Sequence, residues 1–438
     1  MDFANILRII ELSKFSTHRR NNCRLCSSSD LALAVDMEAI PPQELYFDTA
    51  SEASAVPRYP VDLYFCNNCS HVQQLDILNS NALWNDYTYE SGKAKGMSEH
   101  FQDFSSSVLE EYPCQSKDDY VLDIGSNDGT LLTFFKDSGY QVLGVDPAKS
   151  VADIANAKGV NTIPDFFNKK LVESVLSSYG KAKIITAFNA FAHADDLDEI
   201  ASSIKLLLDY DGVFYFEVQY LVDIVEKVLI GSIFHEHMSH HSLTPLIKFL
   251  KKHGLEIVDI ERNNIQNGAL IGKVKHIRQS NKVAHTVTDL VELESRLGVD
   301  NILYIKRLSS SIEMIKRDVA TFLKKADSGI AIAGYGAARS GQTLITQTGL
   351  EGVIEYIFDD HPKKLGKYPA GDGIKVVPTK RLLLKQPEYT VVLAWVHVRT
   401  IIKKNVEYLR RGGEFLVLTP TFNIVNNDNY EHFLEYWG

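Results

Sequence analysis

Four cysteines near the start of the chain have the spacing of metal ligands. They form two Cys-x-x-Cys pairs about forty residues apart, at Cys23 and Cys26 and at Cys66 and Cys69. Each such turn presents two thiolates to one tetrahedral metal ion, and four thiolates leave no open position for water or substrate. The pattern therefore predicts a structural zinc site. The alternatives are surface dithiols, a redox pair, or a site in which His71 replaces one cysteine.

A second group of candidate residues lies in a short glycine-containing loop. The sequence DIGSNDG, from Asp123 to Gly129, follows an apolar segment and opens a helical one. Such a loop lets the backbone approach a ligand at a helix N-terminus. Asp146 ends the next apolar segment, where an acidic side chain can meet ribose hydroxyls. Because the loop differs from GxGxxG, it favours S-adenosylmethionine (SAM) over a dinucleotide, with Asp123, Gly125 and Asn127 as loop contacts.

Further cofactor contacts are expected where the next two strands end. Asp165 and Phe166 follow the third strand, and a carboxylate beside an aromatic ring could meet the adenine there. Core packing is the alternative for Phe166 and for its neighbour Phe167. Asn189 and His193 follow the fourth strand, and open α/β sheets bind ligands at the carboxyl ends of their strands.

The densest group of chemically active residues is the segment FHEHMSHHS at 234–242. It carries His235, His237, His240 and His241, and packing does not explain four histidines within seven residues. A metal site is the weaker interpretation, because histidines at i and i+2 do not share a helical face as they do in HExxH. Histidine titrates near neutrality, so the segment predicts acid–base catalysis.

A parallel α/β sheet would position these residues. From about residue 120, apolar segments alternate with helical ones, and this alternation indicates βαβ units. The expected strands are VLDIG, QVLGVD, AKIITAF and GVFYFEV. Two later segments predict an antiparallel close of the same sheet, HGLEIVDIER and ALIGKVKHI.

The pattern changes beyond residue 285. Apolar residues from Ile305 to Phe322 recur at spacings of three and four, which predicts a long helix with one apolar stripe. Packing between domains is favoured over a coiled coil, because the repeat is short. A second open α/β sheet is then predicted from GIAIAGYGAARSGQTLI, IEYIFDD, YTVVLAW and EFLVLTP. The expected domains are 1–85, 86–285 and 286–438.

Composition limits the classes of function. The chain has 438 residues, 45% hydrophobic and 23% charged, which suits roughly three domains. A formal net charge of -10 argues against a nucleic-acid-binding surface. The sequence has no long apolar run and no secretory signal, so we expect no membrane association and a cytoplasmic protein.

These motifs resemble those of the SAM-dependent C-methyltransferases that act on nucleotide-linked keto-deoxysugars. The resemblance covers nearly the whole chain. It includes both cysteine pairs, a YxYxSG stretch, LDIGSNDGTLL, NAFAHADDL, the HEH segment, and the C-terminal YGA, DxxPxK and LAW motifs. The resemblance implies an α/β protein with a small N-terminal zinc-binding module, a central class I SAM methyltransferase (Rossmann-like) domain, and a C-terminal Rossmann-like domain that binds the nucleotide-linked sugar.

The resemblance also implies catalytic roles. A histidine of the HEH motif is the proposed base in the family, and the matching residue is His237. It would remove a proton from a carbon adjacent to a ketone, because the resulting enolate places its charge on the ketone oxygen. The expected donors to that oxygen are His235, Tyr87 and Tyr89. Glu236 is expected to orient a histidine.

The chain departs from the family pattern on segments expected to face the substrate. A tyrosine before HEH is Phe234, a tyrosine pair is replaced by His240 and His241, and a C-terminal lysine is replaced by Ser340. The expected substrate contacts are His240, His241, Tyr335, Arg339 and Lys364. Solvated surface charge is the alternative for the basic residues of the C-terminal domain.

The main prediction is therefore C-methylation of a nucleotide-linked keto-sugar, for a surface polysaccharide or a glycosylated metabolite. An O- or N-methyltransferase on the same scaffold is the alternative, because the substituted positions leave the acceptor atom open. An RNA-binding or non-catalytic protein is a third interpretation, which the negative net charge and the intact SAM loop disfavour. The expected partners are SAM, zinc and a small-molecule nucleotide-linked sugar.

Overall fold

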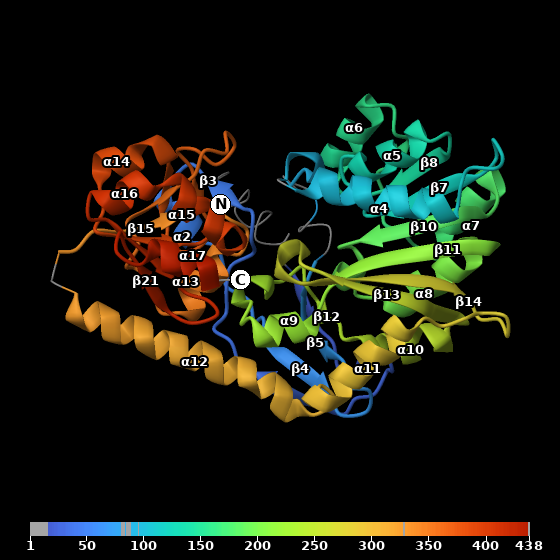
Figure 1. Cartoon of the computed structure of the whole chain (residues 1–438), viewed down its shortest axis with the longest axis horizontal. Helices are drawn as coiled ribbons and strands as arrows, with labels where there is room; N and C mark the ends of the chain where they lie inside the picture. The colour runs from blue at the N-terminus through green and yellow to red at the C-terminus, as the bar shows by residue number, and fades with distance from the viewer. Residues whose placement is uncertain (1–15, 80–83, 85–88, 95, 327–328, 437–438) are drawn as a thin grey trace, which may run out of the picture.

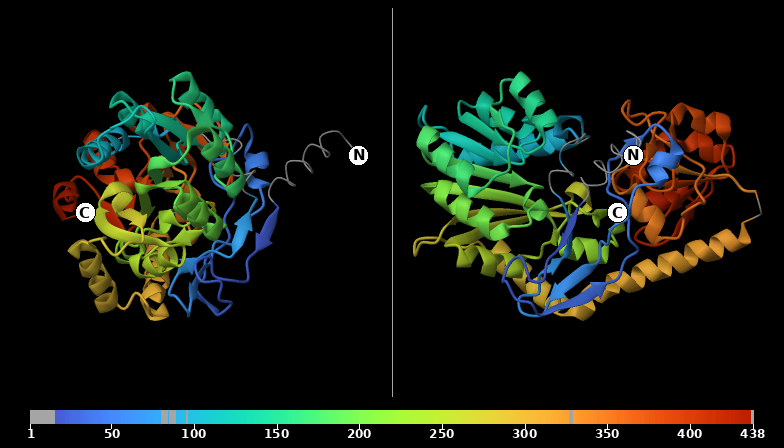
Figure 2. Two further views of the ribbon diagram at one scale, coloured as in Figure 1. Left: turned by 90° about the vertical axis from the view of Figure 1, so that its right-hand side faces the viewer. Right: turned by 180° about the vertical axis from the view of Figure 1, so that it is seen from behind.

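The computed structural model describes residues 16–79, 84, 89–94, 96–326 and 329–436. An α/β unit lies at each end of the molecule, and the N-terminal strands lie between them (Figure 1). Helix α12 (Ile302–Lys325) runs along one side from one unit to the other, as the view from behind also shows (Figure 2). Segments far apart in the sequence therefore meet in the middle of the molecule.

The central unit contains a sheet with the strand order β13-β14-β11-β10-β7-β8-β9. The strands from β11 to β9 run parallel, and β14 and β13 are added in antiparallel pairing. Their bounds are β7 (Tyr120–Ile124), β8 (Gln141–Val145), β9 (Thr162–Ile163), β10 (Ala182–Phe188), β11 (Leu208–Gln219), β13 (Leu255–Asn263) and β14 (Ala269–His276). The predicted parallel sheet with an antiparallel close is confirmed.

Helices cover both faces of this sheet, because alternate strand residues point to opposite sides. Val121 and Ile184 pack in one hydrophobic cluster with residues of α4 and α5, whereas Leu122 and Ile185 pack in another with residues of α7, α8 and α10. The helices are α4 (Met97–Glu111), α5 (Thr130–Asp137), α6 (Lys149–Ala157), α7 (Lys169–Tyr179), α8 (Leu197–Leu207), α10 (Leu243–Lys252) and α11 (His285–Leu297). In Figure 1 the arrow of β10 points toward the middle of the molecule. The carboxyl edge of the sheet therefore faces the other parts of the chain.

The C-terminal unit is a second sheet, with the order β18-β16-β15-β19-β20-β21. Its strands are β15 (Ile332–Tyr335), β16 (Tyr356–Phe358), β18 (Lys375–Val377), β19 (Tyr389–Val392), β20 (Glu414–Val417) and β21 (Asn423–Val425). Its helices are α13 (Gly341–Gln347), α14 (Leu382–Lys385), α15 (Val398–Lys404), α16 (Val406–Arg410) and α17 (Tyr430–Tyr436). The four predicted strands are present. Strands β18 and β21 were not predicted from the sequence.

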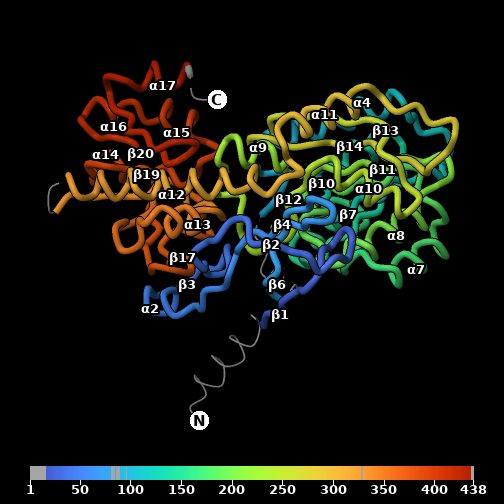
Figure 3. Tube along the Cα trace, turned by 90° about the horizontal axis from the view of Figure 1, so that it is seen from below, coloured from blue at the N-terminus to red at the C-terminus, as the bar shows by residue number. Residues whose placement is uncertain are grey.

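The N-terminal strands pair with both other units. One sheet has the order β12-β5-β4-β2, and its edge strand β12 lies within the histidine segment. Strand β3 pairs with β17 of the C-terminal unit, and β1 pairs with β6. The bounds are β1 (Thr17–Arg19), β2 (Leu31–Val35), β3 (Tyr46–Phe47), α2 (Ala50–Ser54), β4 (Leu63–Cys66), β5 (Val72–Gln73), β6 (Asp76–Leu78), β12 (Ser239–His240) and β17 (Tyr368–Pro369). Seen from below, β2, β4 and β12 lie between the two α/β units, and β3 lies beside the C-terminal unit (Figure 3).

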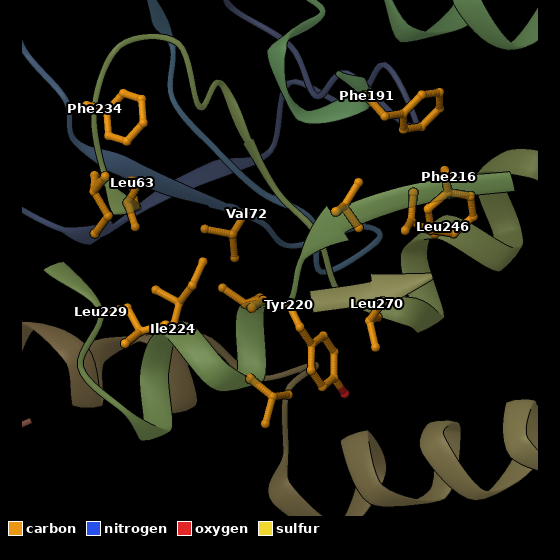
Figure 4. Close-up of a cluster of buried hydrophobic side chains, with 14 of the residues drawn as sticks. Leu63, Val72, Phe191, Phe216, Tyr220, Ile224, Leu229, Phe234, Leu246 and Leu270 are labelled. Carbon is orange, nitrogen blue, oxygen red and sulfur yellow. The ribbon is translucent and has the colours of Figure 1, made fainter. Parts of the chain in front are cut away.

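One hydrophobic core joins the N-terminal strands to the central unit. Leu63 and Val72 of the N-terminal sheet belong to the same cluster as Phe216, Tyr220 and Phe234 (Figure 4). The predicted apolar stripe of α12 is buried as well, and α12 contacts β2 and α9 (Leu221–Glu226). This helix packs between parts of the chain, as expected. Among the described residues, no helix is both long enough and apolar enough to cross a membrane.

Candidate functional site

The four predicted cysteine ligands lie together beside the N-terminal sheet. Their Sγ atoms are all within 4.8 Å of one another, with 3.6 Å between Cys23 and Cys69 and 3.5 Å between Cys26 and Cys66. Tetrahedral zinc–sulfur bonds of about 2.3 Å require sulfur atoms roughly 3.8 Å apart. The cluster therefore fits a zinc ion closely. His71 is not part of this group of ligand atoms.

Both cysteine turns have the same backbone shape. The residue after each pair, Ser27 or Ser70, has a positive φ of 61° or 68°. Its N–H donates to the carbonyl of the first cysteine of that pair, Cys23 or Cys66. Two copies of one turn thus present their thiols to a common centre, which is the arrangement that the spacing predicted.

The predicted SAM loop is a tight turn between β7 and α5. Gly125 has a φ of +74°, and a Cβ there would lie 2.8 Å from the Cβ of Ala190. Asn127 also has a positive φ, and its side chain binds the preceding segment: Nδ2 donates to the carbonyl of Tyr89, and Oδ1 accepts from the N–H of Ser91. The loop is held between residues 89–94 and the end of β10.

Asp146 lies beside this loop at the end of β8. Its Oδ2 accepts from the N–H of Asn127 at 2.8 Å, and its Oδ1 accepts from the N–H of Ala148 at 2.8 Å. Burial raises the pKa of Asp146 to about 6, although both hydrogen bonds favour the charged form. Each carboxylate oxygen can accept a further bond. The buried hydroxyl of Ser126 has no hydrogen-bond partner among the described residues, so the loop retains polar groups that suit a nucleoside ligand.

The other predicted cofactor residues on this side of the sheet differ in exposure. Asp123 is buried and accepts from Oγ1 of Thr186 at 2.6 Å, and burial raises its pKa to about 7. Asp165 is exposed after β9, Phe166 is half-buried, and Phe167 is buried in the core. Core packing therefore accounts for Phe167, whereas the ring of Phe166 keeps an exposed surface.

Asn189, at the end of β10, binds a buried carboxylate, Glu217, that the sequence motifs did not predict. Its Nδ2 donates to Oε1 of Glu217 at 3.0 Å. Glu217 lies on β11, has no exposed surface, and places Oε2 2.5 Å from Nε2 of His100 on α4. A charged residue within the apolar strand GVFYFEV was the signal that could have identified Glu217. His100 carried no comparable signal.

The first part of the histidine segment, residues 234–238, forms a loop between η3 (Ile230–Ser232) and β12. From residue 230 to residue 240 every side chain is buried except His237, which is half-buried. Nδ1 of His237 lies 2.7 Å from the carbonyl oxygen of Ser232. A carbonyl only accepts, so Nδ1 carries the proton and Nε2 carries the lone pair.

The ring of His237 belongs to a stack of aromatic rings. Its centroid is 4.0 Å from that of Phe234 and 5.0 Å from that of His193, which in turn stacks on Trp84. Burial lowers the pKa of His237 to about 4, the backbone hydrogen bond opposes this, and the charge of Arg339 lowers it further. Burial also lowers the pKa of His193. Both rings are therefore neutral at pH 7, the form that can accept a proton.

Arg339 brings a positive charge from the C-terminal unit to this loop. Its Nη1 donates to Oε1 of Glu236 at 3.2 Å, and the carboxylate is buried. Burial raises the pKa of Glu236, and the charge of Arg339 lowers it. A second contact joins the C-terminal unit to the segment just before this loop: Oγ1 of Thr343 donates to the carbonyl of Ile233 at 3.2 Å.

The other histidines of the loop lie in packed interiors. His235, His240 and His241 are at most 2% exposed. Nε2 of His235 lies 3.2 Å from the carbonyl oxygen of Tyr59, and the ring of His241 stacks on that of His71 at 5.4 Å. These positions favour packing over contact with a substrate. The catalytic role of His235 and the substrate contacts of the other two stay predictions.

The N-terminal strands hold the loop immediately after His237. Strand β12 pairs with β5, and the backbone N–H of Gln74 donates to the carbonyl of Met238 at 2.9 Å. Nε2 of Gln74 donates to the carbonyl of Phe234 at 3.0 Å. Nη1 of Arg24, which lies inside the first cysteine turn, donates to the carbonyl of Met238 at 3.2 Å. The side chain of Arg24 thus connects the first cysteine turn directly to the histidine loop.

The predicted residues of the C-terminal unit differ in position. Tyr335 is buried in the core of that unit against Phe358 and Phe415. Nζ of Lys364 donates to the carbonyl of Ala337 at 2.9 Å and lies 3.1 Å from Oε1 of Glu44. Tyr335 and Lys364 therefore have partners within the protein, and their substrate contacts stay predictions.

The two tyrosines expected near the acceptor are Tyr87 and Tyr89. Tyr87 lies outside the described residues. Tyr89 is half-buried, and its carbonyl binds Asn127 of the SAM loop. Tyr89 thus lies where the YxYxSG stretch meets the cofactor loop.

Family models match consecutive parts of the chain. They are a zinc binding domain at residues 23–84, a methyltransferase domain at residues 97–260, and a C-methyltransferase C-terminal domain at residues 264–420. Together with the cysteine cluster, these matches confirm the predicted fold class, SAM as cofactor and zinc as metal. They also confirm the resemblance to C-methyltransferases.

A relative that aligns over most of the chain agrees with these matches. C-methyltransferase NovU of Streptomyces niveus is 27% identical over 411 residues, which cover 93% of this chain and 98% of the relative. A SAM-dependent methyltransferase structure from Anabaena variabilis ATCC 29413 is 16% identical, with a TM-score of 0.33 over 40% of this chain and 84% of its own. Another, from Clostridium acetobutylicum ATCC 824, is 15% identical, with a TM-score of 0.33 over 42% of this chain and 93% of its own.

Proposed function

The chain is an S-adenosylmethionine-dependent methyltransferase related over most of its length to C-methyltransferases, and on this premise we propose that it methylates a carbon next to the ketone of a nucleotide-linked sugar. His237 is the base that removes the proton from that carbon. The central sheet binds SAM, and the C-terminal unit binds the nucleotide. The proposed domain borders are 1–85, 86–285 and 286–438.

The position of His237 carries the proposal. It is the half-buried residue of an otherwise buried loop. The Ser232 carbonyl holds the proton on Nδ1, which leaves the lone pair of Nε2 for the substrate. A general base needs an accessible lone pair and a fixed orientation, and this ring has both. No other histidine of the segment is exposed to this degree among the described residues.

The electrostatics of the loop suit a substrate that carries negative charge. Burial and the charge of Arg339 lower the pKa of His237 to about 4, against its backbone hydrogen bond, so the ring is neutral but a weak base before substrate binds. An anionic diphosphate nearby would raise the pKa of this ring and strengthen the base. Arg339 and Lys364 are the proposed contacts of that diphosphate.

SAM supplies an electrophilic methyl group on a positively charged sulfur. On our proposal Asp146 accepts the ribose hydroxyls, Phe166 covers the adenine, and Asn189 and His193 line the methionine end. The loop at Gly125 approaches the cofactor through its backbone. Fixing donor and acceptor in line contributes much of the acceleration, because it removes the entropic cost of their encounter.

Zinc has a structural role in this proposal. Four thiolates complete a tetrahedral site, so no position is open for water or substrate. The metal shapes the turn from which Arg24 contacts the carbonyl of Met238, next to the proposed base. The reaction would serve the synthesis of a surface polysaccharide or a glycosylated metabolite in the cytoplasm.

The test is a panel of nucleotide-linked 4-keto-sugars incubated with the protein and SAM in deuterated water, followed by mass spectrometry and NMR. We expect one added methyl on carbon and exchange of the adjacent proton for deuterium in the absence of SAM. A methyl on oxygen or nitrogen would instead establish the alternative acceptor class. No reaction and no exchange with any member of the panel would contradict the proposed substrate class.

A further inference from the structure

A buried histidine–glutamate pair lies at the carboxyl edge of the central sheet, outside the histidine loop. Nε2 of His100 is 2.5 Å from Oε2 of Glu217. Glu217 is fully buried, and the side chain of His100 is 12% exposed. Oε1 of Glu217 accepts from Nδ2 of Asn189, and its Oε2 lies 3.4 Å from Nδ2 of Asn263. Both oxygens of the carboxylate are thus hydrogen-bonded, whereas Nδ1 of His100 has no hydrogen-bond partner among the described residues.

The pair lies next to the proposed cofactor site. Asn189, which binds Glu217, precedes Ala190, and Ala190 is the residue that would touch a Cβ on Gly125 of the SAM loop. His100 lies in the first turns of α4, and its ring centroid is 6.1 Å from that of Phe188 at the end of β10. The cofactor loop follows β7, and the carboxyl ends of β10 and β11 lie on one side of it. An acceptor must approach from this side to meet the methyl group.

The surroundings of His100 favour its charged form. Burial opposes protonation, but the hydrogen bond and charge of Glu217 outweigh it and raise the pKa of His100. The carboxylates of Glu261 on β13 and Asp103 on α4 act in the same direction. When His100 is protonated, its Nε2–H is held by Glu217, and its Nδ1–H has no hydrogen-bond partner among the described residues.

A buried ion pair needs a reason, because desolvation offsets much of the attraction between its charges. A positive charge near the N-terminus of a helix is also unfavourable. Apolar residues would close this edge of the sheet at lower cost. These costs are typical of a group that is kept for its chemistry.

We propose that His100 donates a hydrogen bond from Nδ1 to the ketone oxygen of the acceptor, and that Glu217 positions this donor. The proposal rests on the proposed function, since it concerns the same reaction. When His237 removes the proton, the C–H electron pair forms the C=C bond of the enolate and the C=O π pair moves to oxygen. His100 stabilises the charge on that oxygen. When the enolate carbon attacks the methyl group, the C–S electron pair goes to sulfur and the C=O bond forms again.

This role fills a gap in the site. The enolate oxygen needs a donor, and the residue before HEH is Phe234, which has no hydroxyl. His235 points its Nε2 at the carbonyl of Tyr59. Protonated His100 is a donor at the edge of the sheet that the acceptor must approach. Preorganised donors to a developing oxyanion commonly contribute more to the rate than any other single feature of an active site.

The first test is His100→Gln, measured as deuterium exchange into the keto-sugar without SAM and as methyl transfer with SAM. We expect kcat for both to fall about 100-fold, the usual effect of removing one oxyanion donor, with SAM affinity unchanged within about twofold. The matched control is His253→Gln. His253 also pairs with a carboxylate, Asp198 at 2.7 Å, and its side chain is 10% exposed. It lies just before β13, however, and the start of that strand is at the opposite edge of the sheet. The control should keep wild-type kcat.

The second test is Glu217→Gln, which preserves shape but removes the negative charge. Because the donor must be protonated, activity is lost as pH rises through the pKa of His100. Without Glu217 that pKa falls, so the alkaline limb of the kcat profile should shift to lower pH. If Glu217 had only a structural role, the Glu217→Gln substitution would not shift the alkaline limb of the kcat profile.

The outcomes separate this role from the proposed function. If wild-type protein exchanges and methylates the sugar but His100→Gln matches its control, the role of His100 is wrong and the proposed function stands. If His100→Gln weakens SAM binding instead of kcat, the residue contacts the cofactor and the role is likewise wrong. If wild-type protein acts on no keto-sugar, both proposals fail together.

Discussion

The cofactor edge of the central sheet and the histidine loop are built in different ways. The edge is made by short turns that directly follow β7, β8 and β10, and its main contacts join neighbours, such as Asp146 to Asn127 at 2.8 Å. The histidine loop has little structure of its own. It is held by β5, by Arg24 of the first cysteine turn, and by Arg339 of the C-terminal unit.

Because the two regions are built differently, SAM binding and base catalysis should be separable in this protein. A change in the N-terminal module or in the C-terminal unit reaches the histidine loop through direct contacts. At the cofactor edge the N-terminal module pairs with Asp195, beyond the end of β10, but among the described residues it makes no hydrogen bond to the side chain of Asp146 or Asn127. Conversely, a change at Asp146 leaves the contacts of the loop intact. Substitutions in each region can therefore test this separation.

The largest effect is expected for His237→Ala. Loss of a general base typically costs 10²- to 10⁴-fold, so we expect methyl transfer to fall about 1000-fold. SAM affinity, measured by calorimetry, should remain within about twofold of wild type. His276→Ala, at the far end of β14, is the control and should keep full activity. Near-normal turnover of His237→Ala would assign the base to another group.

Removal of zinc should have the next largest effect. Metal analysis should find about one zinc per chain, and Cys66→Ser should lose it. Because the cysteine turns carry the contacts to Met238 and β12, we expect turnover to fall about 100-fold, while SAM still binds. Loss of SAM binding together with zinc would show that the two regions are coupled rather than separable. Cys114→Ser, outside the cluster, is the control.

Asp146→Ala should act on the cofactor edge alone. Hydrogen bonds to charged groups contribute about 1.5–3 kcal/mol, so the Kd for SAM should rise about 10- to 100-fold. Turnover at saturating SAM should change less. The pKa of about 6 adds a pH test: below it the carboxylate is protonated and loses acceptor capacity, so SAM affinity of the wild type should fall as pH drops through 6. Unchanged affinity in the variant would remove Asp146 from the site.

The smallest effect is a shift of the pH profile in Arg339→Gln. Burial and the charge of Arg339 both lower the pKa of His237. Removing that charge raises this pKa, and a base must be deprotonated to act. The acid limb of kcat should therefore move to higher pH. Arg307→Gln, which breaks a surface pair with Glu226, should leave the limb in place. An unmoved limb in Arg339→Gln would mean that the C-terminal unit does not act on the loop electrostatically.

Residues that act through local chain geometry could be predicted from the sequence. The cysteine spacing predicted the metal cluster, and DIGSNDG after an apolar strand predicted the turn at Gly125. The apolar stripe predicted α12. In each case a short motif, such as each Cys-x-x-Cys turn, or the period of one element carries the information, so it can be read from the spacing of residues.

Tertiary packing determines which polar residues face the site. Four histidines in one segment look equivalent in the sequence, but only the fold buries His235 and leaves His237 half-exposed. Arg339 reaches the loop across more than a hundred residues, and His100 meets Glu217 from a helix 117 residues earlier in the chain. Such pairs depend on how the sheets and helices pack. Burial and long-range charge are properties of that packing, and they set both the exposure and the pKa of each group.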